Sequence, residues 1–392
     1  MNKYVFILLC SLGVSCANES DPEADKANFV RIYDSDLYNA SFNPIDLQQT
    51  TDGGYLFLGS RKLDGSNFSG AYLLKVDALG AFVSEQLVDE GYVAPAGGLL
   101  PLNGNYYFFC MSAPSLETQL VEVGPEGTIL ETYPVGGTYP TAAAVDGNNF
   151  ILLGYDNVSR ETVVSIVNET GSVLQATGYG IGAGETVEEP IINHFLRTGR
   201  QFPFQVGRTS GGQYFFNGFY NYTFSLVFTD LGAGGLGVVQ GQQDDGGLSQ
   251  VVQLTGGTYA AARFNFGDNY FLPNATLGTS GITSSTDLGG FPVPELVKNA
   301  PVRILPSKIN DKDVVLYASN TKSGQIGIYV YDRSNGEFLG SKYLGFSNPF
   351  EVNSMINTTD EGMAIGATTY VTGRFPRITL FKLSAKELSS IF

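Results

Sequence analysis

Residues 48–58 read QQTTDGGYLFL, a small polar turn that leads into a short hydrophobic strand. Glycine supplies the positive φ angles of a tight hairpin, and the aspartate can hydrogen-bond to the backbone of the turn. Tyr, Leu and Phe suit a pleated surface that is mostly buried. The stretch therefore predicts a β-hairpin, with one strand before the Gly-Gly turn and a second strand after it.

The same turn-and-strand pattern recurs along the chain. Counted from residue 52, related stretches begin at residues 103, 146, 210, 255, 310 and 360, so that successive copies lie 43 to 64 residues apart. The copy at residue 255 is the weakest. Repeats at a period of about 40–50 residues, with several strands in each, are typical of β-propellers.

A second pattern follows the first in most repeats, and consists of a strand that ends in a polar turn with glycine. Its clearest copy is AYLLKVDALG at residues 71–80, and others occupy residues 119–127, 163–171 and 328–336. Each repeat then contains four strands, because a third strand ends at this turn and a fourth follows it. No segment shows sustained helical periodicity, so the sequence predicts an all-β chain.

The combination of QQTTDGGY at residues 48–55 with LxKxDxxG at residues 73–80 closely resembles the repeats of secreted bacterial β-propeller proteins. The resemblance covers roughly residues 40–388 and is nearly silent on function. It implies a single β-propeller, and the seven copies of the turn predict seven four-stranded blades, with the third strand of the fifth blade hard to place between Phe266 and Leu288. The single uninterrupted series of repeats disfavours the alternative, two β-sandwich domains.

The two ends of the repeat series predict how the ring closes. The last repeat runs out near residues 381–384 without a full fourth strand, whereas Phe29–Tyr33 form a strand that has no repeat of its own. Pairing this N-terminal strand into the last blade would remove an open sheet edge. We therefore expect Phe29–Tyr33 to close the ring.

The first residues have the pattern of a secretory signal peptide. Lys3 gives a basic start, and the apolar run at residues 4–12 is too short to cross a bilayer. LGVSC at residues 12–16 resembles a bacterial lipobox, in which the cysteine is lipidated, although its leucine lies one place too early. This predicts a signal peptide over residues 1–15 and lipidation at Cys16, with ordinary cleavage after Ala17 as the alternative.

The segment after the signal peptide predicts a tether. Residues 16–27 are polar and acidic and contain a proline, which suits a flexible tether, and residues 28–392 form the propeller. Alanine rather than aspartate at position 17 resembles sorting to the outer membrane. The predicted location is the outer membrane or the cell surface, as a lipoprotein. A periplasmic or secreted soluble protein is the alternative.

The composition excludes several classes of protein. The chain has 392 residues with 22 Lys and Arg against 38 Asp and Glu, and its formal net charge of −16 disfavours nucleic-acid binding. Hydrophobic residues make up 43%, which is enough for a core and excludes a disordered chain. Three cysteines are too few for a disulfide scaffold, and Cys110, in an apolar run, is predicted to be a buried, inert thiol.

The single histidine, His194, falls in the longest gap between repeats, which indicates an insertion in the fourth blade. Such an insertion opens on the propeller face where loops usually form binding sites. The candidate ligand-binding residues are Glu188, Glu189, His194, Arg197 and Arg200. Aromatic residues are dense from Phe195 to Phe228, and exposed rings there could stack on sugars. For the insertion, the structural alternatives are a solvated loop or a histidine whose hydrogen bonds are satisfied within the fold. For the aromatic residues, the alternative is packing between blades.

The sequence contains no recognisable catalytic constellation. It lacks a serine in Gly-x-Ser-x-Gly, a phosphate-binding loop and cysteine or histidine pairs with metal spacing. We therefore predict no catalytic residue, no metal site and no cofactor; calcium at the acidic turns has no support from a full loop pattern. The favoured function is a lipid-anchored, non-enzymatic binding or scaffold protein of the cell envelope with a protein or glycan partner. It would touch the membrane only through its lipid. A carbohydrate-binding or carbohydrate-cleaving surface protein is the alternative.

Overall fold

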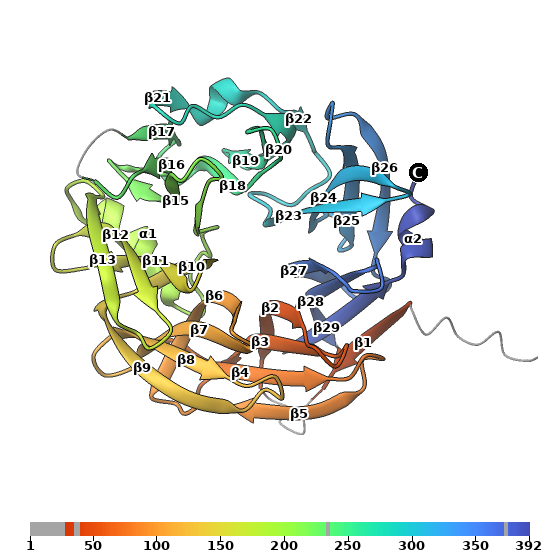
Figure 1. Ribbon diagram of the computed structural model, residues 1–392, viewed down its shortest axis with the longest axis horizontal. Helices are drawn as coiled ribbons and strands as arrows, with labels where there is room; N and C mark the ends of the chain where they lie inside the picture. Colours follow the sequence, from red (N-terminus) through yellow and green to blue (C-terminus); the bar gives the residue numbers. More distant parts are fainter. Residues whose placement is uncertain (1–27, 35–39, 233–235, 372–374) are drawn as a thin grey trace, which may run out of the picture.

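The computed structural model describes residues 28–34, 40–232, 236–371 and 375–392. Its sheets stand side by side in a ring, and the strands within each sheet follow one another from the ring axis outward (Figure 1). Nearly all strand pairs are antiparallel neighbours in sequence, because the glycine turns reverse the chain within a few residues. The fold is an all-β propeller, as the repeats predict.

The strands at the start of the chain form two meanders. The first consists of β2 (Phe42–Gln49), β3 (Tyr55–Lys62), β4 (Ser69–Val76) and β5 (Phe82–Leu87). The second consists of β6 (Tyr92–Leu102), β7 (Asn105–Ser112), β8 (Glu117–Val123) and β9 (Ile129–Thr138). Pairing of Gly70 in β4 with Val93 in β6 joins them into one eight-stranded sheet.

The other sheets follow around the ring. One contains β10 (Pro140–Asp146), β11 (Asn149–Asp156), β12 (Glu161–Asn168) and β13 (Val173–Gly180). The next contains β14 (Gln205–Arg208), β15 (Tyr214–Tyr220), β16 (Thr223–Thr229), β17 (Gly237–Gln240) and β21 (Gly281–Ser284). It is followed by β18 (Gly246–Gln253), β19 (Tyr259–Asn265), β20 (Asp268–Ala275) and β22 (Phe291–Pro292). Then come β23 (Val302–Ile309), β24 (Lys312–Asn320), β25 (Ile326–Asp332) and β26 (Phe338–Leu344).

The prediction of seven four-stranded blades is wrong. The described residues form six sheets, of which four have four strands, one has five and one has eight. One cause is the pairing of β4 with β6. The other is β21, which pairs in parallel with β17 and leaves β20 with only the two-residue strand β22 as its outer partner. The strand that the sequence left unplaced after Phe266 is β20.

The ring closes as predicted. The last sheet contains β27 (Phe350–Asn357), β28 (Met363–Val371), β29 (Phe375–Leu383) and β1 (Phe29–Tyr33). β1 pairs antiparallel with β29 from Phe29 opposite Lys382 to Tyr33 opposite Ile378. The N-terminal strand therefore completes a sheet made otherwise from the C-terminal repeat, and this confirms its role in closure.

The expectation of a chain without helices is wrong at two places. The insertion before β14 contains α1 (Glu185–Phe195), and the chain ends with α2 (Ala385–Ser389); a short 3-10 helix covers Ser285–Leu288. Val187, Ile191 and Phe195 are buried at a spacing of four residues, so α1 has one apolar face that turns toward the ring. In the described part of the chain, no helix is long and apolar enough to cross a membrane.

The two ends of the ring carry different connections between strands. Arg303 Nε donates to the carbonyl oxygen of Asn353, and Asn357 Nδ2 donates to that of Pro306 at 2.9 Å, so β23 and β27 run in the same direction. The hairpins that end such first strands therefore lie at one end of the ring, which we call the turn face. The opposite end, where α1 leads into β14, is the loop face.

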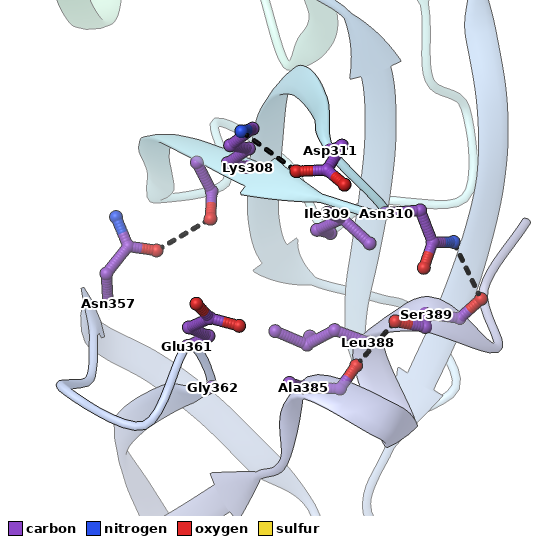
Figure 2. Close-up of a pocket in the computed structure, with 11 residues that line it drawn as sticks. Lys308, Ile309, Asn310, Asp311, Asn357, Glu361, Gly362, Ala385, Leu388 and Ser389 are labelled. Carbon is purple, nitrogen blue, oxygen red and sulfur yellow. Dashed lines mark hydrogen bonds and ion pairs between the residues drawn. The ribbon is translucent and has the colours of Figure 1, made fainter.

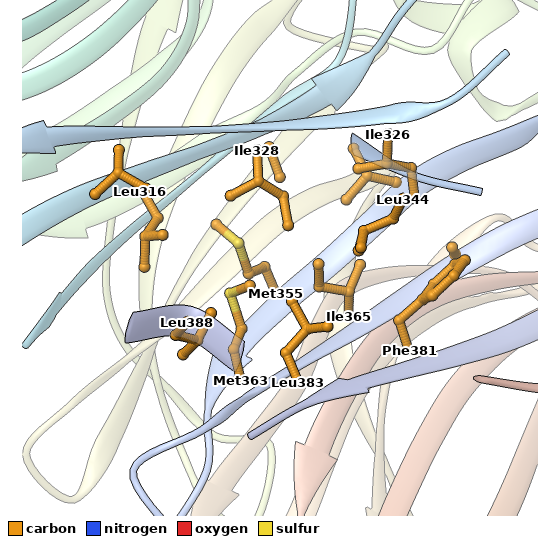
Figure 3. Packing of buried hydrophobic residues seen from close by; sticks show 14 of the residues in the cluster. Leu316, Ile326, Ile328, Leu344, Met355, Met363, Ile365, Phe381, Leu383 and Leu388 are labelled. Carbon is orange, nitrogen blue, oxygen red and sulfur yellow. The ribbon is translucent and has the colours of Figure 1, made fainter. Parts of the chain in front are cut away.

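The core consists of apolar clusters between neighbouring sheets. One such cluster joins β24, β25 and β26 to β27, β28 and β29, and Leu388 of α2 extends it (Figure 3). Phe and Tyr rings fill much of the space elsewhere, for example Phe202, Phe219 and Phe224, which are buried and pack against one another. Phe216 packs against Tyr179 of β13, and Phe228 packs against Tyr259 of β19, which confirms packing between blades for these two aromatics. Cys110 is also buried, and burial raises the pKa of its thiol to about 12.

The repeat motif that revealed the fold holds a buried lysine under its turn. Lys75 Nζ donates to both carboxylate oxygens of Asp52, at 2.8 and 2.9 Å, and to Thr50 Oγ1 at 2.6 Å. Asp52 also accepts the N–H of Gly54 at 2.9 Å, which fixes the turn. The last sheet repeats the arrangement, with Lys382 donating to Asp360 at 2.8 and 3.0 Å. The motif therefore ties a third strand to the preceding hairpin.

Candidate functional site

The insertion on the loop face carries the residues that the sequence singled out. Glu188 on α1 accepts a hydrogen bond from Tyr155 Oη at 2.7 Å and lies 3.9 Å from Arg160 Nε. Glu189 is exposed. The backbone N–H of Arg197 donates to the carbonyl oxygen of Asn67, in the loop between β3 and β4, at 2.8 Å. These contacts attach α1 and the residues after it to two different sheets.

His194 is held between aromatic rings. Its ring meets those of Phe195 and Phe204 edge to face, with centroids 5.3 and 4.8 Å away. Its Nδ1 accepts the backbone N–H of Phe202 at 2.9 Å, which places the proton of the neutral ring on Nε2. Burial lowers the pKa of His194 to about 4. The imidazole is therefore neutral near pH 7 and supports the backbone of the insertion.

Arg200 attaches the end of the insertion to the connection between β17 and β18. Its guanidinium lies 3.3 Å from Asp244 and 3.7 Å from Asp245, and stacks over the ring of Phe202 at 4.6 Å. The insertion thus bridges sheets that lie far apart around the ring (Figure 1). Glu188, His194 and Arg200 contact different neighbours, and these contacts hold the insertion, residues 185–204, in place. A ligand site at these residues stays a prediction.

The first strand of several sheets lies nearest the ring axis, and a polar side chain at one equivalent position of these strands hydrogen-bonds to the backbone of the next sheet. Asp46, Gln205 and Gln250 each lie three residues before the end of their strand. Gln205 exchanges two hydrogen bonds with the backbone of Val251, at 2.6 and 2.9 Å, and Asp46 accepts the N–H of Leu99 at 2.9 Å. Burial raises the pKa of Asp46. These side chains hydrogen-bond the first strand of one sheet to the first strand of the next, and we assign them a role in holding neighbouring sheets together.

A cavity of about 470 Å³ lies on the turn face, between the β23–β24 hairpin, the β27–β28 hairpin and α2 (Figure 2). Its floor is apolar, because Ile309 and Leu388 are buried there. Its rim is polar and consists of Lys308, Asn310, Asp311, Asn357, Glu361 and Ser389. A volume of this size lies within the range of about 300–1,000 Å³ that small-molecule sites occupy.

Hydrogen bonds set the rim of this turn-face cavity. Asn357 accepts from Ser307 Oγ at 2.8 Å and donates to the carbonyl oxygen of Pro306, so its amide is fixed between two sheets. Lys308 Nζ lies 3.0 Å from Asp311 Oδ1, and this hydrogen bond raises the pKa of Lys308. With Glu361, the rim has two carboxylates and one ammonium group. Such a rim suits a polar ligand without negative charge.

The described chain begins next to this cavity. Asn28 Oδ1 accepts the N–H of Ser384 at 2.7 Å, and Ser384 caps α2 by accepting the N–H of Glu387 at 3.2 Å. Three cavity residues, Ala385, Leu388 and Ser389, belong to α2. In the sequence, the turns at residues 310 and 360 indicated only where one strand ends and the next begins. It gave no signal that they meet the C-terminal helix.

Metal binding has no support among the residues that the structure describes, where no group of three or more His, Cys, Asp and Glu could hold an ion. Cys16 and the rest of the predicted signal peptide and tether lie outside the described residues.

Comparisons with known proteins concern the fold alone. No protein-family model and no curated protein sequence matches the chain. A solved structure from Bacteroides caccae, of unknown function, is 15% identical over 74% of this chain and 94% of its own, with a TM-score of 0.41. The β-propeller domain of the Trilobed protease from Pyrococcus furiosus is 9% identical over 90% of this chain and 98% of its own, with a TM-score of 0.46. The periplasmic gluconolactonase of Pseudomonas aeruginosa is 9% identical over 88% and 97%, with a TM-score of 0.44. We draw no functional conclusion from similarities at this level.

Proposed function

We propose that the protein is a lipid-anchored, non-enzymatic binding protein of the cell envelope, and that it recognises its partner through the turn-face cavity. The observation that carries the proposal is the cavity itself, with its buried apolar floor and its polar rim of side chains held by the ring. The rim groups supply most of the recognition, because Ile309 and Leu388 are nearly fully buried and leave only a small apolar surface for a ligand to cover.

The lipid anchor rests on the sequence. Cys16 follows a small residue after an apolar run, and residues 17–27 would join it to the first described residue, Asn28. We place the protein at the outer membrane or the cell surface on this basis. The partner is a protein or a glycan of the envelope, and no nucleic acid is expected at a chain with a net charge of −16.

The test is capture of the partner from detergent-solubilised envelopes with a tagged protein. Ala385→Trp places a large side chain in the cavity wall, whereas Lys386→Trp adds the same side chain at the next, exposed position of α2, which does not line the cavity. We expect wild type and Lys386→Trp to capture a stoichiometric partner and Ala385→Trp to lose it. Capture by Ala385→Trp at the level of wild type would place recognition elsewhere. Cys16→Ala should release the protein from the membrane fraction.

A second candidate function is carbohydrate binding or cleavage. The observation that favours it is the chemistry of the rim, where the amides of Asn310 and Asn357 and two carboxylates offer the donors and acceptors that sugar hydroxyls need. A glycan-binding screen with the Ala385→Trp and Lys386→Trp pair tests this site. Alanine at Glu188, Glu189 and His194 tests the loop face. Activity on any glycan that survives all three alanine changes would rule out those residues as its catalytic site.

A further inference from the structure

The position where the described chain begins fixes which face of the propeller lies near an N-terminal anchor. Phe29 pairs with Lys382 at the end of β29, and Leu383 pairs with Met363, which directly follows the β27–β28 hairpin. Phe29 therefore lies at the turn-face end of its sheet. The hydrogen bond from Ser384 to Asn28 places the preceding residue beside α2, at the wall of the cavity. The chain leaves the fold on the turn face.

The length of chain available to an anchor can be compared with the height of the propeller. Residues 17–27 span at most about 39 Å when fully extended. A strand such as β24, which has nine residues, rises about 26 Å from the turn face to the loop face. An orientation with the loop face against the membrane would use about two thirds of the full extension merely to pass along the side of the ring. Stretching a short chain to that degree is entropically unfavourable.

We propose that the turn face is apposed to the lipid surface that holds the anchor, so that the cavity opens into the gap between propeller and bilayer. This inference rests on the proposed lipidation of Cys16. It narrows the partner to a polar ligand, without negative charge, that is displayed at the membrane surface. The loop face, where α1 and the insertion cap the ring, points away from the membrane.

The test is energy transfer from a label on the protein to an acceptor dye on the headgroups of liposomes that carry the lipidated protein. Lys308→Cys places a label on the turn face, and Ser323→Cys places one on the loop face of the same sheet; both positions are exposed. Cys110 is buried and should not compete for the label. We expect transfer from Lys308→Cys to exceed that from Ser323→Cys about twofold or more, because their heights differ by about 26 Å.

Two controls separate the possible failures. The same labels on Cys16→Ala protein should give no energy transfer. If the protein that retains Cys16 also fails to bind the liposomes, the lipid anchor is refuted. Doubling the length of the segment 17–27 with glycine and serine should reduce the difference between the two labels. Equal transfer from both labels at the native length, or stronger transfer from Ser323→Cys, would refute the orientation while leaving the anchor intact.

Discussion

The buried lysine of the repeat motif offers the sharpest test of how the fold is held. In the native protein the Lys75 side chain is 1% exposed, whereas the carboxylate that it contacts, Asp52, is 52% exposed. Asp52→Asn keeps an oxygen that can accept the N–H of Gly54, so the turn geometry survives, while the charge and the second acceptor oxygen for Lys75 are lost. Lys75 is then left as a buried cation with two neutral partners, Thr50 and the remaining side-chain oxygen at position 52.

The size of the effect follows from the asymmetry of this pair. The hydrogen bonds from Lys75 and Thr50 lower the pKa of Asp52 from 3.8 to about 2. That shift corresponds to about 2.5 kcal/mol, which solvent screening at a half-exposed carboxylate reduces to about 1 kcal/mol. Leaving a buried charge unpaired costs about 3–5 kcal/mol when water is fully excluded. Because the Asp52 side is open to water, we expect Asp52→Asn to lose about 2–3 kcal/mol of unfolding free energy.

The matched variant is Lys75→Met, which removes the buried charge and leaves Asp52 in water. It should cost less than about 1.5 kcal/mol, and the double variant should be no less stable than Lys75→Met alone. Urea unfolding followed by far-UV circular dichroism measures all three. A loss below about 0.5 kcal/mol for Asp52→Asn, or a larger loss for Lys75→Met than for Asp52→Asn, would refute the reasoning.

Further predictions concern pH and packing. The folded-state pKa of Asp52 lies below its unfolded value, so its contribution to stability is present above pH 4 and is lost as the pH falls toward about 2; acid titration of wild type, but not of Asp52→Asn, should show this loss. The single histidine should titrate with a midpoint near 4 in proton NMR, and a midpoint at 6 or above would contradict the burial of His194. Folded-state stability from this group is complete above pH 6.5 and falls as the pH drops toward 4, because the unfolded chain takes up the proton first. Gly98→Ala should destabilise the fold by about 1–3 kcal/mol in the same urea assay, because Gly98 has φ of 77° and a Cβ there would lie 2.6 Å from Asp46 Oδ2; an unchanged midpoint would contradict this.

The sequence predicted the strands and the closing of the ring because both depend on local patterns. Each glycine turn marks the end of one strand and the start of the next, and Phe29–Tyr33 had no other partner. The sheet count could not be predicted in the same way. The pairing of Gly70 with Val93 and of β21 with β17 depends on where neighbouring repeats lie in space, and neither segment has a distinctive local pattern.

The helix α1 was missed for a different reason. Its apolar residues do recur every four positions, but only three of them do so, and Pro190, a residue that disfavours a helix interior, lies within it. A pattern that short resembles a loop. The motif with Lys75 was recognised as a repeat, but its sequence does not reveal that the ammonium group is buried beneath Asp52. Burial depends on the strand that covers it.

The turn-face cavity is the least predictable feature. Its wall combines residues near 308, near 360 and near 388, which are brought together by two sheets and a terminal helix. Each of the three segments looks like an ordinary turn or chain end in the sequence. The loop-face residues attracted attention instead because the gap between repeats is longest there, and the structure shows that this gap holds a cap packed against several sheets.

Amide hydrogen exchange of the protein with and without its captured partner tests the central claim most directly. The account predicts added protection in the hairpins at residues 309–312 and 357–363 and in α2, and little change in α1. Protection confined to residues 185–204, with the turn face unchanged, would contradict it and would instead support recognition through Glu188, His194 and Arg200.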